Sequence, residues 1–315
     1  MIDSRRTFIK KTAITGAAMM AAPAFTGSAF AANPRKASDA ITPFRLKYAP
    51  SVGMFREHAG NNIADNVKFC HDMGFRAMFD NGLMGRPVED QLKLANEISR
   101  HGMELGPFVL YADFSVTSFV LNNPEVRKML TDRMKEGVEV FRRTGVKWAL
   151  VVPGRYDERL SPDYQTANVI DNLRLCCDIV EKEGLTIVLE PLNTLRDHPG
   201  LFLKRIPQAY AVCRAVNRPS CKIVNDLYHQ QITEGNLIPN IEAAWSEIAA
   251  FHCGDNPGRN EPTTGEINYR NVFRYIYSRK YDGVICMEHG ISKRGSKEGE
   301  ARVIKAYREC DNFEV

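Results

Sequence analysis

Eight short apolar runs recur along this chain, and polar segments with helical spacing separate them. Each run is rich in β-branched and other apolar residues and is nearly continuous, which is typical of parallel strands covered on both faces. We predict strands at residues 45–49, 77–80, 105–111, 147–152, 186–190, 222–226, 248–252 and 283–288. Apolar positions at helical spacing predict helices between the strands, with clear examples at 87–101, 124–144 and 166–183.

The alternation of strand and helix indicates a single α/β domain. Eight repeats without a break in composition predict a closed (β/α)8 TIM barrel, a fold that typically needs about 250 residues. A doubly wound open sheet is the alternative, but no Gly-x-Gly-x-x-Gly sequence follows an early strand. Thr144-Gly145 and Glu183-Gly184 are expected to end helices immediately before the next strands.

The N-terminus has the features of a twin-arginine export signal. Arg5-Arg6 precedes a weakly apolar, alanine-rich stretch, and a small-residue triplet ending at Ala31 supplies a cleavage site. We therefore predict that residues 1–31 are a leader, recognised by the twin-arginine translocase and removed on export to the periplasm. A disordered N-terminal tail is the alternative.

Removal of this leader would leave a mature domain at residues 32–315. The leader contains Pro23 and two glycines, which makes it a poor membrane-spanning helix, and we predict no membrane span in the mature chain. The length of the mature domain suits one α/β barrel better than a small binding module.

Charge and cysteine usage argue against two classes of protein, nucleic-acid-binding proteins and small disulfide-stabilised domains. The chain has 42 basic and 38 acidic residues, and four of the basic residues lie in the leader, so the mature domain is almost balanced. A balanced domain lacks the basic surface that binding to nucleic acid requires. A domain of this size needs no disulfide framework, and no Cys-x-x-Cys pair occurs among Cys70, Cys176, Cys177, Cys213, Cys221, Cys253, Cys286 and Cys310.

Potential metal ligands stand at the ends of the last four predicted strands. In each case mainly apolar sequence stops at a carboxylate or an imidazole: Glu190, Asp226, His252 and Glu288. A carboxylate at the end of a buried strand must be paired, hydrogen-bonded or bound to a metal. Any one of the four could be a helix cap or an ion-pair partner. Three carboxylates and a histidine at one barrel mouth predict a divalent metal site, because a cation removes their mutual repulsion.

The composition of this ligand set favours particular ions. Three carboxylates and one imidazole suit a single Mn²⁺ or Mg²⁺ ion, with Co²⁺ or Zn²⁺ as alternatives. Four protein ligands leave two positions of an octahedral ion for the oxygens of a small-molecule substrate.

Several motifs resemble the hydroxypyruvate isomerase family, which belongs to the xylose isomerase-like TIM barrels. The matching segments are Glu190-Pro191-Leu192-Asn193, Asn225-Asp226-Leu227-Tyr228-His229, the loop at 257–269, and Tyr281-Asp282-Gly283. The resemblance covers essentially the whole mature chain, and the loop is its most specific part. Barrels of this group often associate, so the resemblance also implies a homo-oligomer.

The resemblance implies roles for particular residues. Glu190 and Glu288 match the paired carboxylates that flank the substrate and transfer its proton. His229 matches a histidine that contacts substrate or handles protons, with orientation of Asp226 as the alternative role. Arg259 is placed to anchor a substrate oxygen or carboxylate, with a solvated loop arginine as the alternative.

Two departures from the family pattern leave the substrate open. Hydroxypyruvate isomerases often carry glutamine at the position of His252, whereas ketose epimerases carry histidine, and the segment 289–295 differs from the usual ending. The predicted function is metal-dependent isomerisation of a hydroxypyruvate-like compound through an enediolate. The alternatives are a ketose 3-epimerase or a related enzyme for exported keto-sugars, a non-catalytic binding barrel, and a metal-dependent nuclease.

Overall fold

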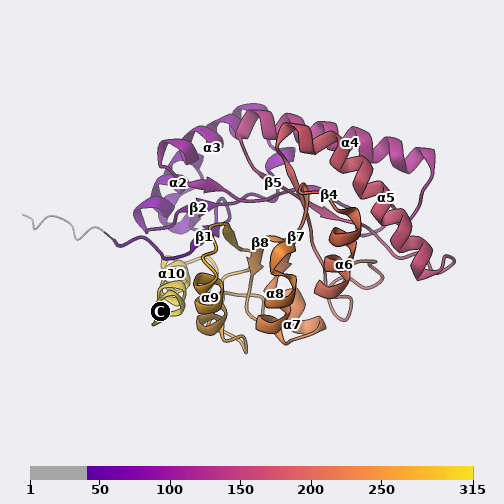
Figure 1. The fold of residues 1–315 in the computed structure, drawn as a ribbon. Helices are drawn as coiled ribbons and strands as arrows, with labels where there is room; N and C mark the ends of the chain where they lie inside the picture. Colours follow the sequence, from indigo (N-terminus) through magenta and orange to yellow (C-terminus); the bar gives the residue numbers. More distant parts are fainter. Residues whose placement is uncertain (1–40, 315) are drawn as a thin grey trace, which may run out of the picture. The chain divides into compact units, whose positions relative to one another are not determined.

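Strands and helices alternate along residues 41–314, the part of the chain that this computed structural model describes (Figure 1). The predicted leader lies outside the described residues. The strands are β1 (Lys47–Pro50), β2 (Ala77–Met78), β3 (Glu104–Leu105), β4 (Phe108–Ala112), β5 (Trp148–Val152), β6 (Thr186–Leu189), β7 (Cys221–Asp226), β8 (Ile248–Cys253) and β9 (Val284–Met287).

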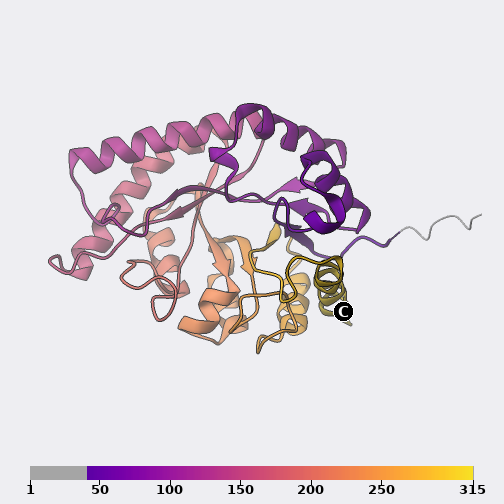
Figure 2. The ribbon, with the colours of Figure 1, turned by 180° about the vertical axis from the view of Figure 1, so that it is seen from behind.

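Helices follow the strands and surround them (Figures 1 and 2). The α-helices are α1 (Arg56–Ala59), α2 (Ile63–Asp72), α3 (Val88–Arg100), α4 (Pro124–Thr144), α5 (Pro162–Val180), α6 (Ile206–Val216), α7 (Leu227–Thr233), α8 (Leu237–Ala244), α9 (Tyr269–Ser278) and α10 (Lys297–Asp311). Three short 3-10 helices are η1 (Leu83–Gly85), η2 (Glu181–Glu183) and η3 (Trp245–Glu247).

The strands are parallel and close into a barrel, which confirms the predicted fold class. Seven of them form one sheet in the order β1-β9-β8-β7-β6-β5-β4, and β2 pairs with β3. Backbone hydrogen bonds from Val52 N to Phe79 O and from Phe79 N to Pro50 O, both 3.1 Å, join β1 to the segment that follows β2. Val109 N donates to Asn81 O at 3.2 Å and closes the remaining gap. All carboxyl ends therefore meet at one mouth.

The prediction of one unbroken strand at residues 105–111 is wrong. The strand is divided into β3 and β4 at Gly106-Pro107, because proline has no N–H to donate to the ladder. Gly106 also packs so closely that a Cβ there would lie 2.9 Å from Phe79 Cβ and 3.1 Å from Cys286 Sγ. The apolar pattern continues across this break, so the pattern alone does not reveal it.

Local signals set the ends of the long helices. The side chain of Asn123 accepts a hydrogen bond from Val126 N at 2.9 Å and caps α4, whose first residue is a proline. As predicted, Gly145 and Gly184 adopt the left-handed conformation at helix ends. The helix predicted at 166–183 begins earlier, at Pro162, and its last turn is the 3-10 helix η2.

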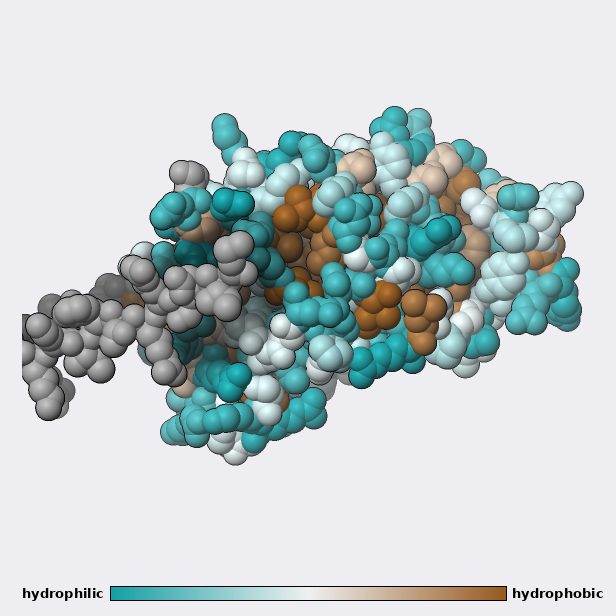
Figure 3. Space-filling model, turned by 90° about the horizontal axis from the view of Figure 1, so that it is seen from below, coloured by the Kyte–Doolittle hydropathy of each residue, from teal (hydrophilic) through white to brown (hydrophobic). Residues whose placement is uncertain are grey.

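Two apolar layers hold the barrel together. Inward-facing side chains of alternate strand positions, such as Ala49, Val188 and Val224, fill its interior, and a larger layer packs between strands and helices. All eight cysteines are buried and free, as expected for small apolar side chains in a large core. Polar side chains cover most of the face seen in Figure 3, with smaller apolar patches between them.

Within the described residues, no helix combines the length and apolar character needed to cross a membrane.

Candidate metal centre

The four predicted ligands come together at the mouth of the barrel. Glu190 directly follows β6, Asp226 ends β7, His252 lies in β8 and Glu288 directly follows β9. Each offers one ligand atom, and these four atoms all lie within 4.8 Å of one another. The parallel register explains the meeting, since Asp226 pairs with His252 across β7 and β8.

His252 is at the centre of this cluster. Its Nδ1 atom lies 3.0 Å from Glu190 Oε1 and 3.2 Å from Glu288 Oε2. The paired glutamates are therefore close to the same nitrogen, although their strands are separated by β7 and β8. Two carboxylates so placed can act on the same small molecule.

Burial makes the cluster electrostatically demanding. Burial and the charge of Glu288 raise the pKa of Glu190 to about 7. Burial also opposes ionisation of Glu288, but the charges of His252 and Arg259 and several hydrogen bonds hold its pKa well below its usual range. The positive groups around the cluster therefore do not neutralise all three carboxylates. The raised pKa of Glu190 means that this carboxyl group retains a proton more readily than an exposed glutamate does.

The geometry and chemistry of the cluster fit a divalent ion. Ligands about 2.1 Å from an octahedral ion are about 3.0 Å apart when adjacent and about 4.2 Å apart when opposite. The separations of 3.0 and 3.2 Å from His252 Nδ1 to the two glutamates match adjacent ligands, and all four ligand atoms lie within 4.8 Å of one another. Three carboxylates and one imidazole are also a donor set that divalent ions of this size accept. Glu190, Asp226, His252 and Glu288 are therefore the residues that would hold the ion.

Arg259 reaches into the same cluster from the loop after β8. Its Nη2 atom donates to Glu288 Oε2 at 2.7 Å and to Asp226 Oδ2 at 3.1 Å. The guanidinium also lies over the ring of Tyr228, 4.8 Å from its centroid. These contacts fix the two carboxylates and place a positive charge beside them.

The buried carboxylate of Asp255 stabilises the loop that carries Arg259 by accepting hydrogen bonds from its backbone. Asp255 is fully buried and accepts hydrogen bonds from the backbone N–H groups of Thr264, Gly265 and Ile267. Arg259 itself has a φ of 48°, in the left-handed region that non-glycine residues seldom adopt. The loop conformation, and not an extended side chain alone, brings Arg259 to the cluster.

His229 also faces the cluster. Its Nε2 atom is buried, has no hydrogen-bond partner among the described residues, and lies 3.6 Å from Asp226 Oδ2. Nδ1 accepts a hydrogen bond from the side-chain amide of Asn193 at 2.7 Å. Burial lowers the pKa of His229 to about 4. His229 is therefore neutral near pH 7, with Nδ1 as acceptor and the N–H on the Nε2 atom that faces the cluster.

Asn193 is an additional site residue, which belongs to one of the family-like motifs but was assigned no role from the sequence. It is fully buried, and its Oδ1 atom accepts hydrogen bonds from the N–H groups of Arg196 and Asp197, both at 3.1 Å. Asn193 therefore links the loop after β6 to His229.

Replacement of Asn193 with alanine should lower the free energy of unfolding by about 1–3 kcal/mol, because buried hydrogen-bonding groups would lose their partners. Urea unfolding followed by circular dichroism measures this change. Asn122→Ala is the matched control, since Asn122 is exposed and should change stability by less than about 0.5 kcal/mol. Equal stability of the two variants would contradict the bridging role of Asn193.

Asn81 also belongs to the site and was not predicted. Its Nδ2 atom donates to Glu288 Oε1 at 2.5 Å, across 207 residues of sequence. Glu288 is thus held by Asn81 through one oxygen and by Arg259 through the other. A lone asparagine after a two-residue strand offers no sequence signal for this contact.

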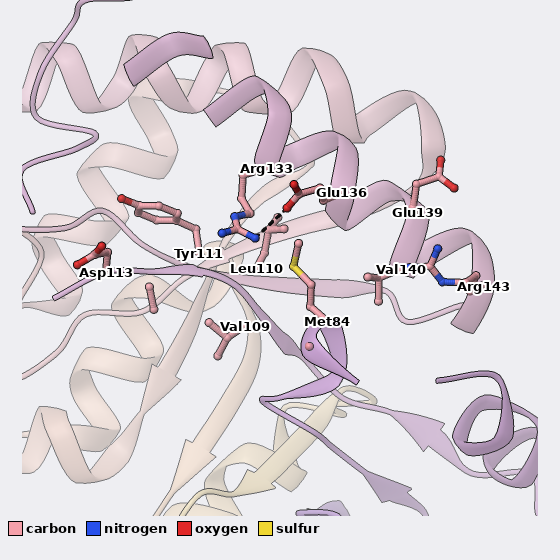
Figure 4. A pocket seen from close by; sticks show the side chains of 12 residues that line it. Met84, Val109, Leu110, Tyr111, Asp113, Arg133, Glu136, Glu139, Val140 and Arg143 are labelled. Carbon is pink, nitrogen blue, oxygen red and sulfur yellow. Dashed lines mark hydrogen bonds and ion pairs between the residues drawn. The ribbon is translucent and has the colours of Figure 1, made fainter. Parts of the chain in front are cut away.

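A separate cavity lies away from the metal centre, between β4, η1 and α4 (Figure 4). Its volume is about 630 Å³, and its lining includes Arg133 and Glu136, which pair at 2.8 Å. Arg143 in the same lining donates to Gln91 of α3 at 2.9 Å. Both arginines therefore already have side-chain partners, and none of the four potential ligands lines this cavity.

Comparison with known proteins identifies similar enzymes. The chain is 34% identical over 123 residues to 2-oxo-tetronate isomerase of Cupriavidus necator, covering 39% of this chain and 47% of that protein. It is 32% identical over 159 residues to hydroxypyruvate isomerase of Escherichia coli, covering 50% of this chain and 61% of that protein. In these alignments the chain spans about half the length of the relatives.

A solved structure with a similar fold is the apo form of 3-keto-D-glucoside 4-epimerase from Escherichia coli. It superposes with a TM-score of 0.68 at 20% identity and covers 84% of this chain and all of that one. Identity at this level shows the fold alone. A family model described as "Xylose isomerase-like TIM barrel" matches residues 67–310, most of the chain. The chain therefore belongs to the xylose isomerase-like TIM barrel family.

Proposed function

We propose that this protein is a divalent-metal-dependent isomerase that moves a proton from the carbon next to a carbonyl group to the carbonyl carbon. The observation that carries the proposal is the pair Glu190 and Glu288, both in contact with the same nitrogen of His252. A binding protein needs an ion or a pocket, but it does not need two carboxylates converging on one reacting carbon. Proton transfer does need them.

The four residues of the metal centre would hold one divalent ion, with Mn²⁺ or Mg²⁺ preferred. When bound, the ion would polarise the carbonyl oxygen and acidify the neighbouring C–H group. Glu190 or Glu288 takes the proton from the carbon that bears the hydroxyl group, and the same or the other glutamate returns it at the former carbonyl carbon. The hydroxyl proton passes to the former carbonyl oxygen, so that the two groups exchange places. Which glutamate acts first depends on the face of the substrate that each one meets.

Two further residues assist this reaction. The Nε2–H group of His229 points toward the cluster without a partner among residues 41–314 and can donate to a substrate oxygen. Arg259 keeps Asp226 and Glu288 in place and can stabilise negative charge that develops on the substrate. Tyr228 limits the movement of the Arg259 side chain.

A hydroxy-keto acid is the first candidate for the substrate. The relatives with 32–34% identity are named for isomerisation of hydroxypyruvate and 2-oxo-tetronate, two keto acids. The second candidate is epimerisation of a ketose or keto-sugar. His252 favours this alternative, because the resemblance associates a histidine at this position with the ketose epimerases. The similar fold of a keto-glucoside epimerase is compatible with it.

The experiment that tests the proposal is solvent-deuterium incorporation, followed by NMR, with Mn²⁺-loaded protein. The substrates are hydroxypyruvate, 2-oxo-tetronate and a panel of ketohexoses and keto-sugars. Exchange in the keto acids supports the first candidate, and exchange only in the sugars supports the second. Absence of exchange in every substrate contradicts the isomerase proposal and favours a binding protein.

Export and association remain predictions that extend this proposal. An isomerase carried across the membrane by the twin-arginine translocase would act on substrates in the periplasm. Association into a homo-oligomer is expected from the family resemblance. Fractionation of cells that express the full chain, and light scattering of the purified protein, test the two predictions separately.

A further inference from the structure

A second cavity adjoins the metal centre on the side of β1. Pro50 of β1 pairs with Met287 of β9, so the next residues of the two strands, Ser51 and Glu288, stand at the same level. Beyond them the loops after β1 and β9 enclose a volume of about 430 Å³. Its lining residues are Ser51, Gly53, Met54, Arg56, Glu57, His289, Gly290, Ile291, Arg294, Gly295 and Glu300. None of the four potential ligands lines this cavity, but two of its lining residues are neighbours of Glu288: His289 in sequence and Ser51 across the β1–β9 pairing.

Two arginines in this lining have no anionic partner. Arg56 and Arg294 are both exposed, and neither forms an ion pair with a residue of the described range 41–314. Arg56 makes one weak hydrogen bond, from Nε to Gly53 O at 3.3 Å. Arg294 folds against Gly290, where a Cβ would lie 2.7 Å from its Nη2 atom. Both guanidinium groups are available to an anion.

The lining also contains two glutamates, Glu57 and Glu300, which differ in their exposure and contacts. Glu300 is buried and already engaged: it accepts hydrogen bonds from Glu57 N at 2.7 Å and His58 N at 3.0 Å, and its Oε2 atom lies 2.5 Å from the ring of His58. Only the exposed Glu57 side chain opposes the arginines. The exposed charged side chains of the lining are therefore two arginines and one glutamate.

Arg259 is less available than Arg56 and Arg294 to bind an anionic group of a ligand. Its guanidinium is committed to Asp226, Glu288 and the ring of Tyr228. A substrate anion bound to it would have to compete with two carboxylates already in contact. Arginine recognises carboxylates and phosphates through paired N–H groups, which requires a side chain free to present them.

We infer that Arg56 and Arg294 form an anion subsite that holds a carboxylate or phosphate group of the substrate beside the metal centre. This inference rests on the proposed isomerase function and narrows its substrate to anionic hydroxy-carbonyl compounds, such as sugar acids or sugar phosphates. The reacting carbons lie at Glu190 and Glu288, and the anionic group extends past Ser51 into the cavity. A neutral ketose would leave both arginines without a partner.

Direct binding tests the subsite without any turnover. Inorganic phosphate and malonate are titrated separately by calorimetry into the full chain, with Mn²⁺ and after chelation, so that binding to the ion is distinguished. We expect the Arg56→Gln/Arg294→Gln variant to bind at least about tenfold more weakly than the wild type. Glu57→Gln should bind more tightly. Arg205→Gln is the control, because Arg205 is exposed and outside the cavity.

The relative affinities identify the anion: preference for phosphate indicates a sugar phosphate, and preference for malonate indicates a sugar acid. Either result supports the subsite. Absence of binding by both probes, or equal binding by the double variant and the wild type, overturns it.

The exchange assay gives an independent kinetic result. In the double variant, KM for an anionic substrate should rise by about tenfold or more while kcat stays within about twofold. KM for a neutral ketose should not change. An unchanged KM for the anionic substrate contradicts the subsite and leaves Arg259 as the anchor. If no substrate exchanges at all, the isomerase proposal fails, and the titrations still decide whether the arginines bind anions.

Discussion

Replacement of either Glu190 or Glu288 with glutamine should reduce turnover by about a thousandfold or more. Each change removes a group that can accept a proton and one negative charge that would hold the ion. Glutamine has nearly the same shape, so the buried contacts with His252 and Asn81 are preserved as far as geometry allows. Turnover is measured as deuterium exchange under saturating Mn²⁺.

Glu104→Gln is the matched control for these two variants. Glu104 lies in β3, at the opposite end of the barrel, where it pairs with Lys47 at 2.9 Å and Lys147 at 2.5 Å. This variant should retain activity within about twofold, since surface ion pairs contribute little to the fold. More than a tenth of wild-type turnover in both Glu190→Gln and Glu288→Gln would refute the proton-transfer scheme.

Removal of divalent ions should abolish activity and also lower thermal stability. At a free Mn²⁺ concentration about 100 times Kd, binding to the folded state adds about 2.7 kcal/mol. For a domain of this size that corresponds to a rise in Tm of about 5–10 °C. Differential scanning fluorimetry with and without chelator measures the shift, and re-addition of Mn²⁺ should restore both properties.

The variant Asp226→Asn separates metal binding from general damage to the fold. Asparagine keeps the oxygen that caps α7 through Tyr228 N at 2.8 Å, but it removes the charge that would bind the ion. Its Tm should therefore not respond to Mn²⁺, whereas Glu104→Gln should respond like the wild type. A wild-type protein whose Tm and activity ignore both chelator and Mn²⁺ would rule out a metal centre.

The apolar pattern predicted the barrel because each strand of a parallel sheet is buried on both faces. The four ligand positions were predictable for a related reason. A charged residue directly after a buried run, as at Glu190 or Glu288, stands out against its neighbours. Parallel pairing then places all such ends at one mouth, so sequence order is enough to assemble them.

Contacts made by loops could not be predicted in this way. Asn81 lies three residues past the end of β2 and meets Glu288, which directly follows β9, so the contact joins two segments beyond the strand ends. Arg259 was predicted as a substrate anchor, and its contacts with Asp226 and Glu288 depend on a left-handed backbone conformation that its residue type does not favour. Such positions depend on tertiary packing, which local periodicity does not encode.

The contact of Arg259 with Asp226 and Glu288 bears on whether the protein folds before or after it binds its metal ion. The repulsion between the clustered carboxylates is partly relieved by a cation that belongs to the chain itself. The barrel can therefore complete its folding before any ion arrives, and loading can follow as a later step. The availability of metal ions would then determine the fraction of active molecules, whereas the amount of protein synthesised would determine the number of folded molecules.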